Sequence, residues 1–473
     1  MSSRDENHRG LQGVFTTQRA AVQSHKTMPL SQRLDLIDGC ISLLNDNADA
    51  LVEAVQADYG SRPGALTLMY DILGSISSLK YARKHVKQWM QPEVRRTPFP
   101  FGLSGAKVHI DYQAKGVIGV LGTWNFPIFT LFSPLAQVIA AGNRCVLKPS
   151  DIVPHTAELL CALLPNYVDR EFLAVVSGDV SVSKAFSELP FDHLVLTGGT
   201  EVGKAVMAAA VPNLTPLTLE LGGKSPVLIG RSAALAKAAE KIIFAKTVNN
   251  GQLCVSPDYV LLAQEQLDEF IEACQKYYSL TFKETHAEIG AIVNEKHYQR
   301  VNSYLRDARA KKVRVIALAD PEEQTPHSLA LHLVINPTED CLISKHEIFG
   351  PAMIVKTYDN VNEAVDFINA GEKPLALYYF GRDSNEQSDV LERTRSGGVT
   401  INQIAMHPGA EDAPFGGIGA SGMGQYHGKE GFLEFSHART VYTQGWFDLA
   451  SLFGMRAPFN DKLRKRLESS LKK

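Results

Sequence analysis

Hydrophobic residues recur with two different periods along the chain. Between residues 30 and 90 they follow the three- and four-residue spacing of a helix face, which predicts a helical N-terminal layer. Residues 107–113 alternate hydrophobic and polar side chains, as a half-exposed strand does. From residue 116 to 402, short hydrophobic runs alternate with helical stretches. That alternation is typical of parallel sheets covered by helices on both faces.

The individual runs predict where the elements lie. Buried strands are expected at 116–121, 145–148, 172–177 and 193–197, and helices at 129–141, 154–164, 181–187 and 201–210. The same alternation after residue 254 predicts a second sheet. The expected fold class is therefore α/β, with two doubly wound parallel-sheet domains in series that meet near residues 217–220. Ligands are expected at the carboxyl ends of the strands.

Composition narrows the class of protein. The chain has 473 residues, 45% of them hydrophobic and 21% charged, which predicts a folded protein of more than one domain. A net charge of −3 gives no electrostatic footprint for nucleic acid. The N-terminus is polar and no run of about 18 apolar residues occurs, so we expect no secretory signal, no integral membrane segment and a cytoplasmic location. The six scattered cysteines argue against a disulfide framework and against a metal site.

Two short motifs hold the candidate chemistry. Glu220 ends the hydrophobic run of Thr-Leu-Glu-Leu-Gly-Gly-Lys-Ser-Pro, where the glycines let another group approach closely. Cys254 follows the Gly-containing turn Asn-Asn-Gly-Gln-Leu-Cys, a setting that gives access rather than packing. Taken singly, such a Glu is more often a paired structural carboxylate and such a Cys more often a core residue.

The two motifs together resemble the aldehyde dehydrogenase superfamily. Glu220 and Cys254 stand 34 residues apart (254 − 220), in the order and with the neighbours of that family's motifs. The motifs Pro-Phe-Gly-Gly at 414–417, Ser-Gly-Met-Gly at 421–424 and Tyr-His-Gly at 426–428 resemble its class 3 branch. That branch includes fatty, aromatic and coniferyl-type aldehyde dehydrogenases.

The resemblance implies a reaction and the residues that perform it. Cys254 would be the nucleophile, Glu220 the general base that activates water, and Asn125 with the Cys254 N–H the oxyanion hole. An aromatic, coniferyl-type or aliphatic aldehyde would be oxidised to the acid through a thiohemiacetal and a thioester. Phe126, Phe415 and His407 would line the substrate pocket, although a solvated loop position is an alternative for His407.

The resemblance also implies NAD as cofactor, with NADP tolerated and no metal. Members of the family more often have Ser or Asn in place of Gly199 and Glu in place of Asp151, so this chain departs from the pattern at two positions. The cofactor-binding residues that the resemblance implies are Thr123, Trp124, Lys148, Asp151, Gly198, Gly199, Gly203, Leu221, Glu347 and Phe349.

Domain boundaries and partners follow from the same resemblance. A cofactor-binding domain is expected at 1–217, interrupted by an oligomerisation strand at 105–115, with 411–430 packing back on it. The catalytic domain is expected at 218–410, a second oligomerisation strand at 431–445 and a C-terminal tail at 446–473. The two strands predict a homodimer. A CoA-acylating enzyme and a non-catalytic binding protein are the alternatives, and the sequence leaves the aldehyde open.

Overall fold

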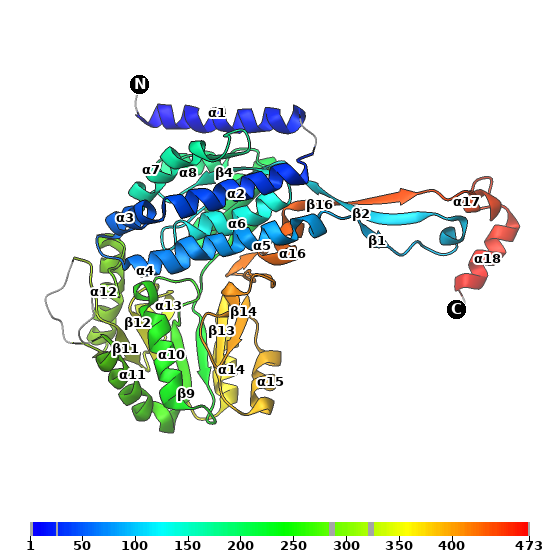
Figure 1. Ribbon diagram of the computed structural model, residues 1–473. Coiled ribbons are helices and arrows are strands. Elements are labelled where there is room, and N and C mark those ends of the chain that lie inside the picture. Colours follow the sequence, from blue (N-terminus) through cyan, green and yellow to red (C-terminus); the bar gives the residue numbers. More distant parts are fainter. Residues whose placement is uncertain (1–2, 25–26, 283–288, 320–325, 472–473) are drawn as a thin grey trace.

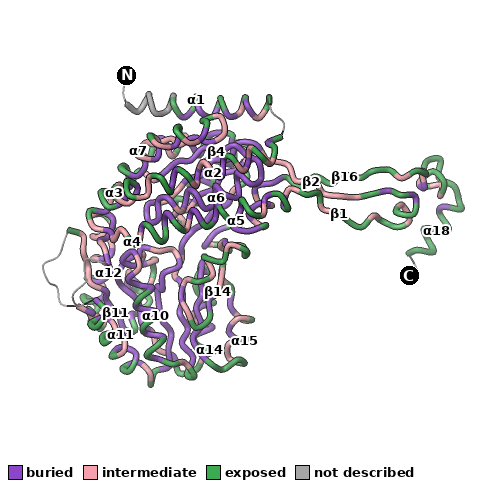
Figure 2. Tube along the Cα trace, viewed as in Figure 1, coloured by how far each residue is buried: buried purple, intermediate pink, exposed green. Residues whose placement is uncertain are grey.

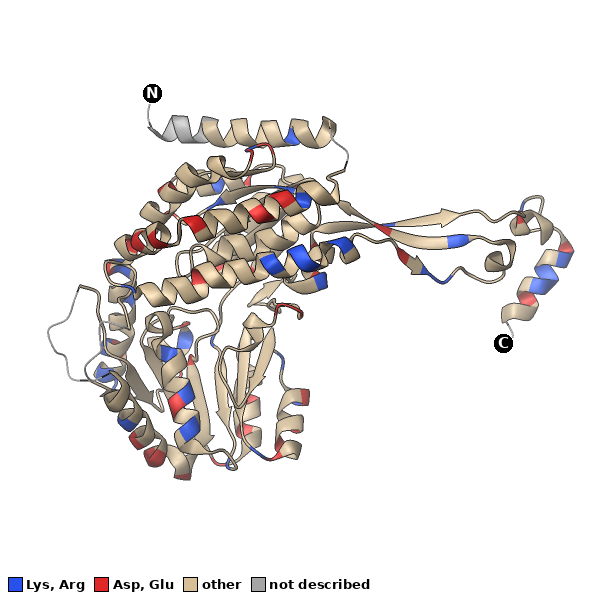
Figure 3. Cartoon of the chain, viewed as in Figure 1, with Lys and Arg blue, Asp and Glu red and all other residues tan. Residues whose placement is uncertain are grey.

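The computed structural model describes residues 3–24, 27–282, 289–319 and 326–471. Its strands form three sheets: two build the body of the molecule together with the helices, and the third extends away from the body (Figure 1). In the body, charged residues lie mainly on helices and loops and are few on the strands of the two large sheets (Figure 3). This arrangement confirms the α/β class.

The first body sheet has six strands in the order β15-β7-β6-β3-β4-β5. β15 joins the edge antiparallel to β7, and the other neighbours are parallel. The central strands β3 and β4 are buried along their whole length, because helices cover both faces of the sheet. The strands are β3 (Val117–Leu121), β4 (Arg144–Lys148), β5 (Leu173–Val175), β6 (His193–Thr197), β7 (Leu217–Glu220) and β15 (Gly422–Met423). The helices that pack on this sheet or beside it are α1 (Ser3–Ser24), α6 (Phe129–Ala140), α7 (Pro154–Leu163), α8 (Val180–Ser187), α9 (Thr200–Ala210) and α16 (Gly428–Glu434).

The second body sheet has seven strands in the order β10-β11-β12-β9-β8-β13-β14. Only β10 runs antiparallel to its neighbour among these described strands. The strands are β8 (Pro226–Ile229), β9 (Tyr259–Ala263), β10 (Arg314–Ala317), β11 (His332–Ile335), β12 (Ala352–Tyr358), β13 (Ala376–Phe380) and β14 (Gly398–Ile401). The helices are α10 (Leu235–Thr247), α11 (Leu267–Phe282), α12 (Glu295–Ala310), α13 (Leu342–Lys345), α14 (Val361–Ala370) and α15 (Ser384–Arg393).

The predicted N-terminal helical layer is present and packs on α6. It consists of α2 (Leu30–Asp46), α3 (Ala48–Tyr59), α4 (Gly64–Leu66) and α5 (Gly74–Trp89). Between α4 and α5 the chain takes one π-helical stretch, η1 (Thr67–Leu73). Such stretches are rare and concentrate near functional sites. This one turns Asp71 fully into the interior while Met69 and Leu73 remain exposed.

The chain passes from the first sheet to the second after Glu220. β7 pairs with β6 and β15, so it belongs to the first sheet. Thr218 and Leu219 continue the parallel strand that begins at Leu217. Segment 411–430 supplies β15 at the edge of the same sheet.

The third sheet is a long arm of three strands, β1 (Glu93–Arg95), β2 (Lys107–Ala114) and β16 (Ser436–Thr443). The strand expected at 105–115 is β2, and it lies at the centre of the arm, because β1 and β16 pair with its two sides. The second strand, expected at 431–445, is helical at its start, in α16. In the arm β1 and β16 are mostly exposed and β2 between them is half-buried (Figure 2). The short α17 (Leu449–Leu452) and α18 (Asp461–Leu471) lie at its far end (Figure 1).

Candidate active site

A cavity of about 410 Å³ opens where the carboxyl ends of β3, β6 and β7 face the turn before β9. Its surface is mostly apolar, with a few convergent polar groups, which is the usual character of a small-molecule site. The residues that line it include Thr123, Trp124, Asn125, Phe126, Gly198, Gly199, Glu220, Leu221, Cys254, His297, Arg300, Glu347, Phe349, Phe415, Tyr426 and His427.

Cys254 stands on a turn that the preceding asparagines make possible. Asn249 and Asn250 both have left-handed backbone angles (φ 49° and 53°), a conformation that asparagine adopts more readily than most residues. Gln252 fixes the turn, because its side chain donates to the Asn249 and Ala291 carbonyls. The Cys254 thiol is therefore presented to the cavity in a defined position.

The surroundings of Cys254 favour the neutral thiol in the resting protein. Burial raises its pKa to about 12, and the nearby carboxylates of Glu347 and Glu220 act in the same direction. The backbone N–H groups of Cys254 and Val255 oppose this shift, because they donate toward the sulfur. A group that removes the thiol proton is consequently needed before the sulfur can act as a nucleophile.

Glu220 ends β7 as a carboxylate without a hydrogen-bond partner. The residue is 2% exposed, and both carboxylate oxygens lack a partner among the described residues. Burial raises its pKa well above the usual range, and the nearby Glu434 raises it further. A buried carboxylate with free lone pairs beside a thiol can accept a proton from the thiol or from a water molecule.

Asn125 brings an amide to the same space. It is 3% exposed, and its Nδ2 donates to the Gln252 carbonyl at 3.1 Å. An amide nitrogen carries two N–H groups, so one remains for an oxygen bound in the cavity. The structure thus places Asn125 on the loop after β3 and ties it directly to the turn that bears Cys254.

One end of the cavity has the features of a phosphate site. The helix α9 begins after Gly199, which provides no side-chain cap, so its first N–H groups are free. A Cβ on Gly199 would meet nothing within 4 Å, which leaves open space in front of those groups. Gly203 has a different role: a Cβ there would come within 2.9 Å of Leu221, so glycine lets α9 pack closely on this residue.

Lys148 and Asp151, two of the predicted cofactor-binding residues, lie just outside the cavity lining. Lys148 ends β4, is buried, and donates to the Pro149 carbonyl at 2.7 Å. Burial lowers its pKa, an effect that Asp151 partly offsets. Asp151 is exposed, and within the described part of the chain its neighbour Ile152, rather than Asp151 itself, borders the cavity.

Glu347 and Phe349 enter the cavity from a strained turn. The Glu347 carboxylate lies over Gly222, where an added Cβ would come within 2.4 Å of it, and burial raises its pKa to about 7. Phe349 has a left-handed backbone (φ 42°) and an edge-to-face contact with Trp124 at 5.3 Å. Together these groups combine flat aromatic walls with a carboxylate that can accept hydrogen bonds from hydroxyl groups, a combination that could hold an aromatic ring and a sugar.

Arg300 and His297 were missed by the sequence reasoning. Arg300 donates to the carbonyls of Glu347, Ile348 and Phe349, which holds the strained turn. His297 lies against Trp124 at 4.7 Å, and burial lowers its pKa to about 4. Their three-residue spacing puts both on one face of α12, a signal that the sequence carried.

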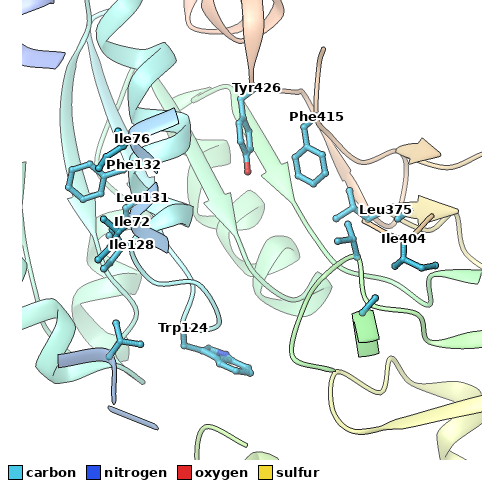
Figure 4. Packing of buried hydrophobic residues seen from close by; sticks show 14 of the residues in the cluster. Ile72, Ile76, Trp124, Ile128, Leu131, Phe132, Leu375, Ile404, Phe415 and Tyr426 are labelled. Atoms are coloured by element: carbon cyan, nitrogen blue, oxygen red, sulfur yellow. The ribbon is translucent and has the colours of Figure 1, made fainter. Parts of the chain in front are cut away.

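The other end of the cavity is aromatic. Phe126 and Phe415 both line it, and Tyr426 contacts Phe415 edge to face at 5.8 Å. Figure 4 shows the rings of Phe415 and Tyr426 next to one another, with the Trp124 side chain reaching toward the same space. His407 packs behind Phe415 and is bonded to Thr400, and within the described residues its neighbour Pro408 lines the cavity instead.

Tyr426 and His427 also line the cavity, and although they stand in the Tyr-His-Gly motif, the sequence did not predict either as a site residue. Tyr426 is buried, and its pKa is raised well above the usual range by burial and by the proximity of Glu220 and Cys254. His427 donates to or accepts from Ser133 at 2.9 Å through Nε2. The closeness of Tyr426 to Glu220 and Cys254 arises only when segment 411–430 folds back on the first sheet.

Across the described ranges, none of the helices has the length and apolar character needed to cross a bilayer. Within the same ranges, His, Cys, Asp and Glu side chains form no group of three or more that could hold a metal ion.

The chain matches the model of the aldehyde dehydrogenase family over residues 7–441. It is 44% identical to a probable coniferyl aldehyde dehydrogenase of Caulobacter vibrioides, with 100% of this chain and 99% of the relative covered. It is 35% identical to the mouse dimeric NADP-preferring aldehyde dehydrogenase, with 91% and 94% covered. Among solved structures, a substrate-bound AldH of Staphylococcus aureus superposes with a TM-score of 0.91 at 32% identity, covering 97% and 99%. An aldehyde dehydrogenase of Mycobacterium tuberculosis complexed with NAD+ gives 0.84 at 25%, covering 93% and 91%.

Proposed function

Because this chain belongs to the aldehyde dehydrogenase family and oxidises aldehydes with NAD or NADP, we propose that Cys254, Glu220 and Asn125 perform the reaction. One observation carries the proposal. The carboxylate of Glu220 is buried without a partner and lies close enough to Cys254 to raise the pKa of its thiol.

In the first step, the Cys254 thiol loses its proton and the sulfur adds to the aldehyde carbonyl carbon. The resulting thiohemiacetal carries its negative charge on oxygen, where the free Asn125 N–H and the Cys254 N–H stabilise it. These donors are held in position before the reaction, in a cavity of low polarity. Removing one such donor typically lowers the rate about 10²–10³-fold. The thiol proton passes to solvent as the sulfur adds, so the Glu220 carboxylate stays free for the last step.

The oxidation would be supplied by NAD or NADP when bound, as the acceptor of the hydride that the thiohemiacetal carbon loses in becoming a thioester. The free N–H groups at the start of α9 and the Gly198–Gly199 turn support binding of its pyrophosphate. Glu347 and Phe349, held by Arg300, would bind its ribose and its ring. Lys148 and Asp151 at the end of β4 would contact the second ribose.

In the last step, Glu220 removes a proton from water, and the water attacks the thioester on Cys254. The carboxylic acid leaves and the thiol is regenerated. The raised pKa of Glu220 suits this task, because a carboxylate that binds protons more tightly is a stronger base near neutral pH.

We assign a coniferyl-type or other aromatic aldehyde as the preferred substrate. The assignment is supported by the name of the Caulobacter relative and by the aromatic end of the cavity, formed by Phe126, Phe415 and Tyr426. A panel of aromatic and aliphatic aldehydes, assayed for NADH formation without CoA, tests it. The highest kcat/KM is expected for a cinnamaldehyde-like substrate. Activity that requires CoA, or a clear preference for short aliphatic aldehydes, would overturn it.

We further propose that the arm joins two copies of the chain. Its outer part exposes large apolar side chains, with Phe99 83% and Trp446 91% exposed, which a monomer in water would leave unpaired. β16 offers a strand edge that pairs with nothing else in the described chain. Sedimentation at micromolar concentration should show a dimer, and a stable, active monomer would contradict this. The six free thiols support a reducing compartment such as the cytoplasm.

A further inference from the structure

The loop that carries Asn125 is anchored through the backbone carbonyl of this residue, not through the side-chain amide that faces the cavity. Three side chains donate to the Asn125 carbonyl: Arg62 through Nη1 at 2.7 Å, Asn249 through Nδ2 at 2.9 Å, and Tyr59 at 3.1 Å through a hydroxyl that it shares with the neighbouring Trp124 carbonyl. A carbonyl oxygen has two lone pairs, so three donors saturate it. The backbone at Asn125 is therefore fixed from three directions.

Arg62 makes the shortest of these contacts and carries a charge. It is 3% exposed, and its guanidinium lies over the rings of Tyr59 at 4.9 Å and Phe126 at 5.0 Å. Hydrogen bonds from a charged donor are stronger than neutral ones, and the planar guanidinium holds its donors in a fixed fork. Neither of the two motifs that carry the chemistry contains Arg62.

Asp71 fixes Arg62 in turn and holds the far end of the same loop. Its Oδ2 accepts from Arg62 Nη2 at 2.6 Å, and both side chains are fully buried. Its Oδ1 accepts from the N–H groups of Ile128 and Phe129, where α6 begins. One carboxylate thus links the arginine to the end of the loop, and the π-helical stretch η1 is what turns it inward.

We propose that Arg62, fixed by Asp71, is a positioning residue that sets the Asn125 amide relative to Cys254. The inference rests on the proposed role of Asn125 and deepens it. Asn249, which shares the Asn125 carbonyl with Arg62, belongs to the turn that carries Cys254. A shift of that carbonyl would therefore misalign both halves of the oxyanion hole. A misplacement of about 1 Å in such a site costs about a hundredfold in rate.

The test is a double-mutant cycle on kcat with Arg62→Lys and Asn125→Ala. Lysine keeps the positive charge for Asp71 but lacks the fork that reaches both acceptors. We expect Arg62→Lys to lower kcat about 10- to 100-fold, with the KM for NAD within about twofold. Asn125→Ala should lower kcat about 10²–10³-fold. The double variant should be no more than about threefold slower than Asn125→Ala alone, because Arg62 acts through that amide.

Arg33→Lys is the matched control. Arg33 is also a buried arginine that donates to backbone carbonyls, those of Met28 and Ala140, but it touches no part of the loop at 124–129. Its substitution should leave kcat within about twofold of the original value. An equal loss of kcat in Arg33→Lys would show a general effect of buried arginine on folding and would overturn the proposal.

The remaining outcomes separate this inference from the assignment of the site. Full kcat in Arg62→Lys, or losses that multiply in the double variant, would overturn the inference alone. Unchanged kcat in Asn125→Ala would overturn the proposed oxyanion role and the inference with it. If Arg62→Lys does not fold, Tyr59→Phe replaces it in the cycle, since it removes only one donor to the same carbonyl. The same lack of additivity is then expected, and multiplied losses would again overturn the inference.

Discussion

Two buried carboxylates lie beside the same active-site loop and are used in opposite ways. Asp71 is bonded to Arg62 and to two backbone N–H groups at the start of α6. Glu220 has neither an ion pair nor a hydrogen bond within the described residues. Burial raises the pKa of both, and that of Glu220 is raised well above its usual range.

The difference distinguishes a group that holds the structure from a group that reacts. A carboxylate held by an arginine and two backbone N–H groups stabilises a fixed geometry, and moving it to react would break those hydrogen bonds. A carboxylate left without partners costs stability, because its desolvation is not compensated, yet it can bind a proton during each turnover. Asp71 therefore belongs to the scaffold and Glu220 to the chemistry.

The largest effect is expected from removing the Cys254 thiol, which lies near the unpaired carboxylate of Glu220. Cys254→Ala should remove dehydrogenase turnover to below detection while NAD binding is retained, because the covalent step is lost and the strands are untouched. Cys161→Ala is the control, since Cys161 is a half-buried cysteine on α7 outside this cavity. Its turnover should stay within about twofold of the original. Residual turnover in Cys254→Ala would break the assignment.

Next in size is the direct contrast of the two carboxylates. Glu220→Gln should lower kcat about 10²–10⁴-fold but leave the free energy of unfolding within about 1 kcal/mol, or raise it. Asp71→Asn should lower the free energy of unfolding by about 3–5 kcal/mol, because it leaves the buried Arg62 charge unpaired. Urea denaturation and steady-state kinetics on both variants measure this. If both variants lost kcat and the free energy of unfolding to a similar extent, the distinction between a reacting Glu220 and a structural Asp71 would be wrong.

A smaller effect concerns pH. The pKa of Cys254 is raised to about 12, so the thiolate fraction increases with pH throughout the range from 7 to 10. Iodoacetamide should therefore alkylate Cys254 in the cofactor-free enzyme about tenfold faster for each pH unit. Peptide mass measurement of the modified cysteine follows the rate. A plateau below pH 9 would show that the thiolate is already formed and that the carboxylates do not keep the thiol neutral.

The smallest effect is expected on the choice between NAD and NADP. Asp151 is exposed and one methylene shorter than the Glu common in the family, which leaves room for a 2′-phosphate. NAD should be preferred over NADP by about tenfold in kcat/KM, or about 1.4 kcal/mol. A preference beyond about a thousandfold would show that the shorter side chain has no influence.

Much of the fold was predictable, because buried parallel strands and amphipathic helices leave a strong alternating pattern. Cys254, Glu220 and Asn125 were named from the sequence and lie together in one cavity. The Arg62–Asp71 ion pair was not predictable. Asp71 reaches Arg62 from within a π-helical stretch, and no hydrophobic pattern in the sequence predicts that backbone conformation. Tyr426 joins the cavity only when its segment returns to the first sheet.

The central claim is that Glu220 activates water rather than the thiol alone, and the pre-steady state of Glu220→Gln tests it most directly. Glutamine keeps the size of the side chain but removes its basicity. Mixing the variant with NAD and aldehyde should give a burst of NADH close to one per active site, followed by turnover lowered about 10²–10⁴-fold. Intact mass should show the acyl group on Cys254, and hydroxylamine should restore part of the rate. Loss of the burst together with turnover would contradict the account, because Glu220 would then be needed to activate Cys254 itself.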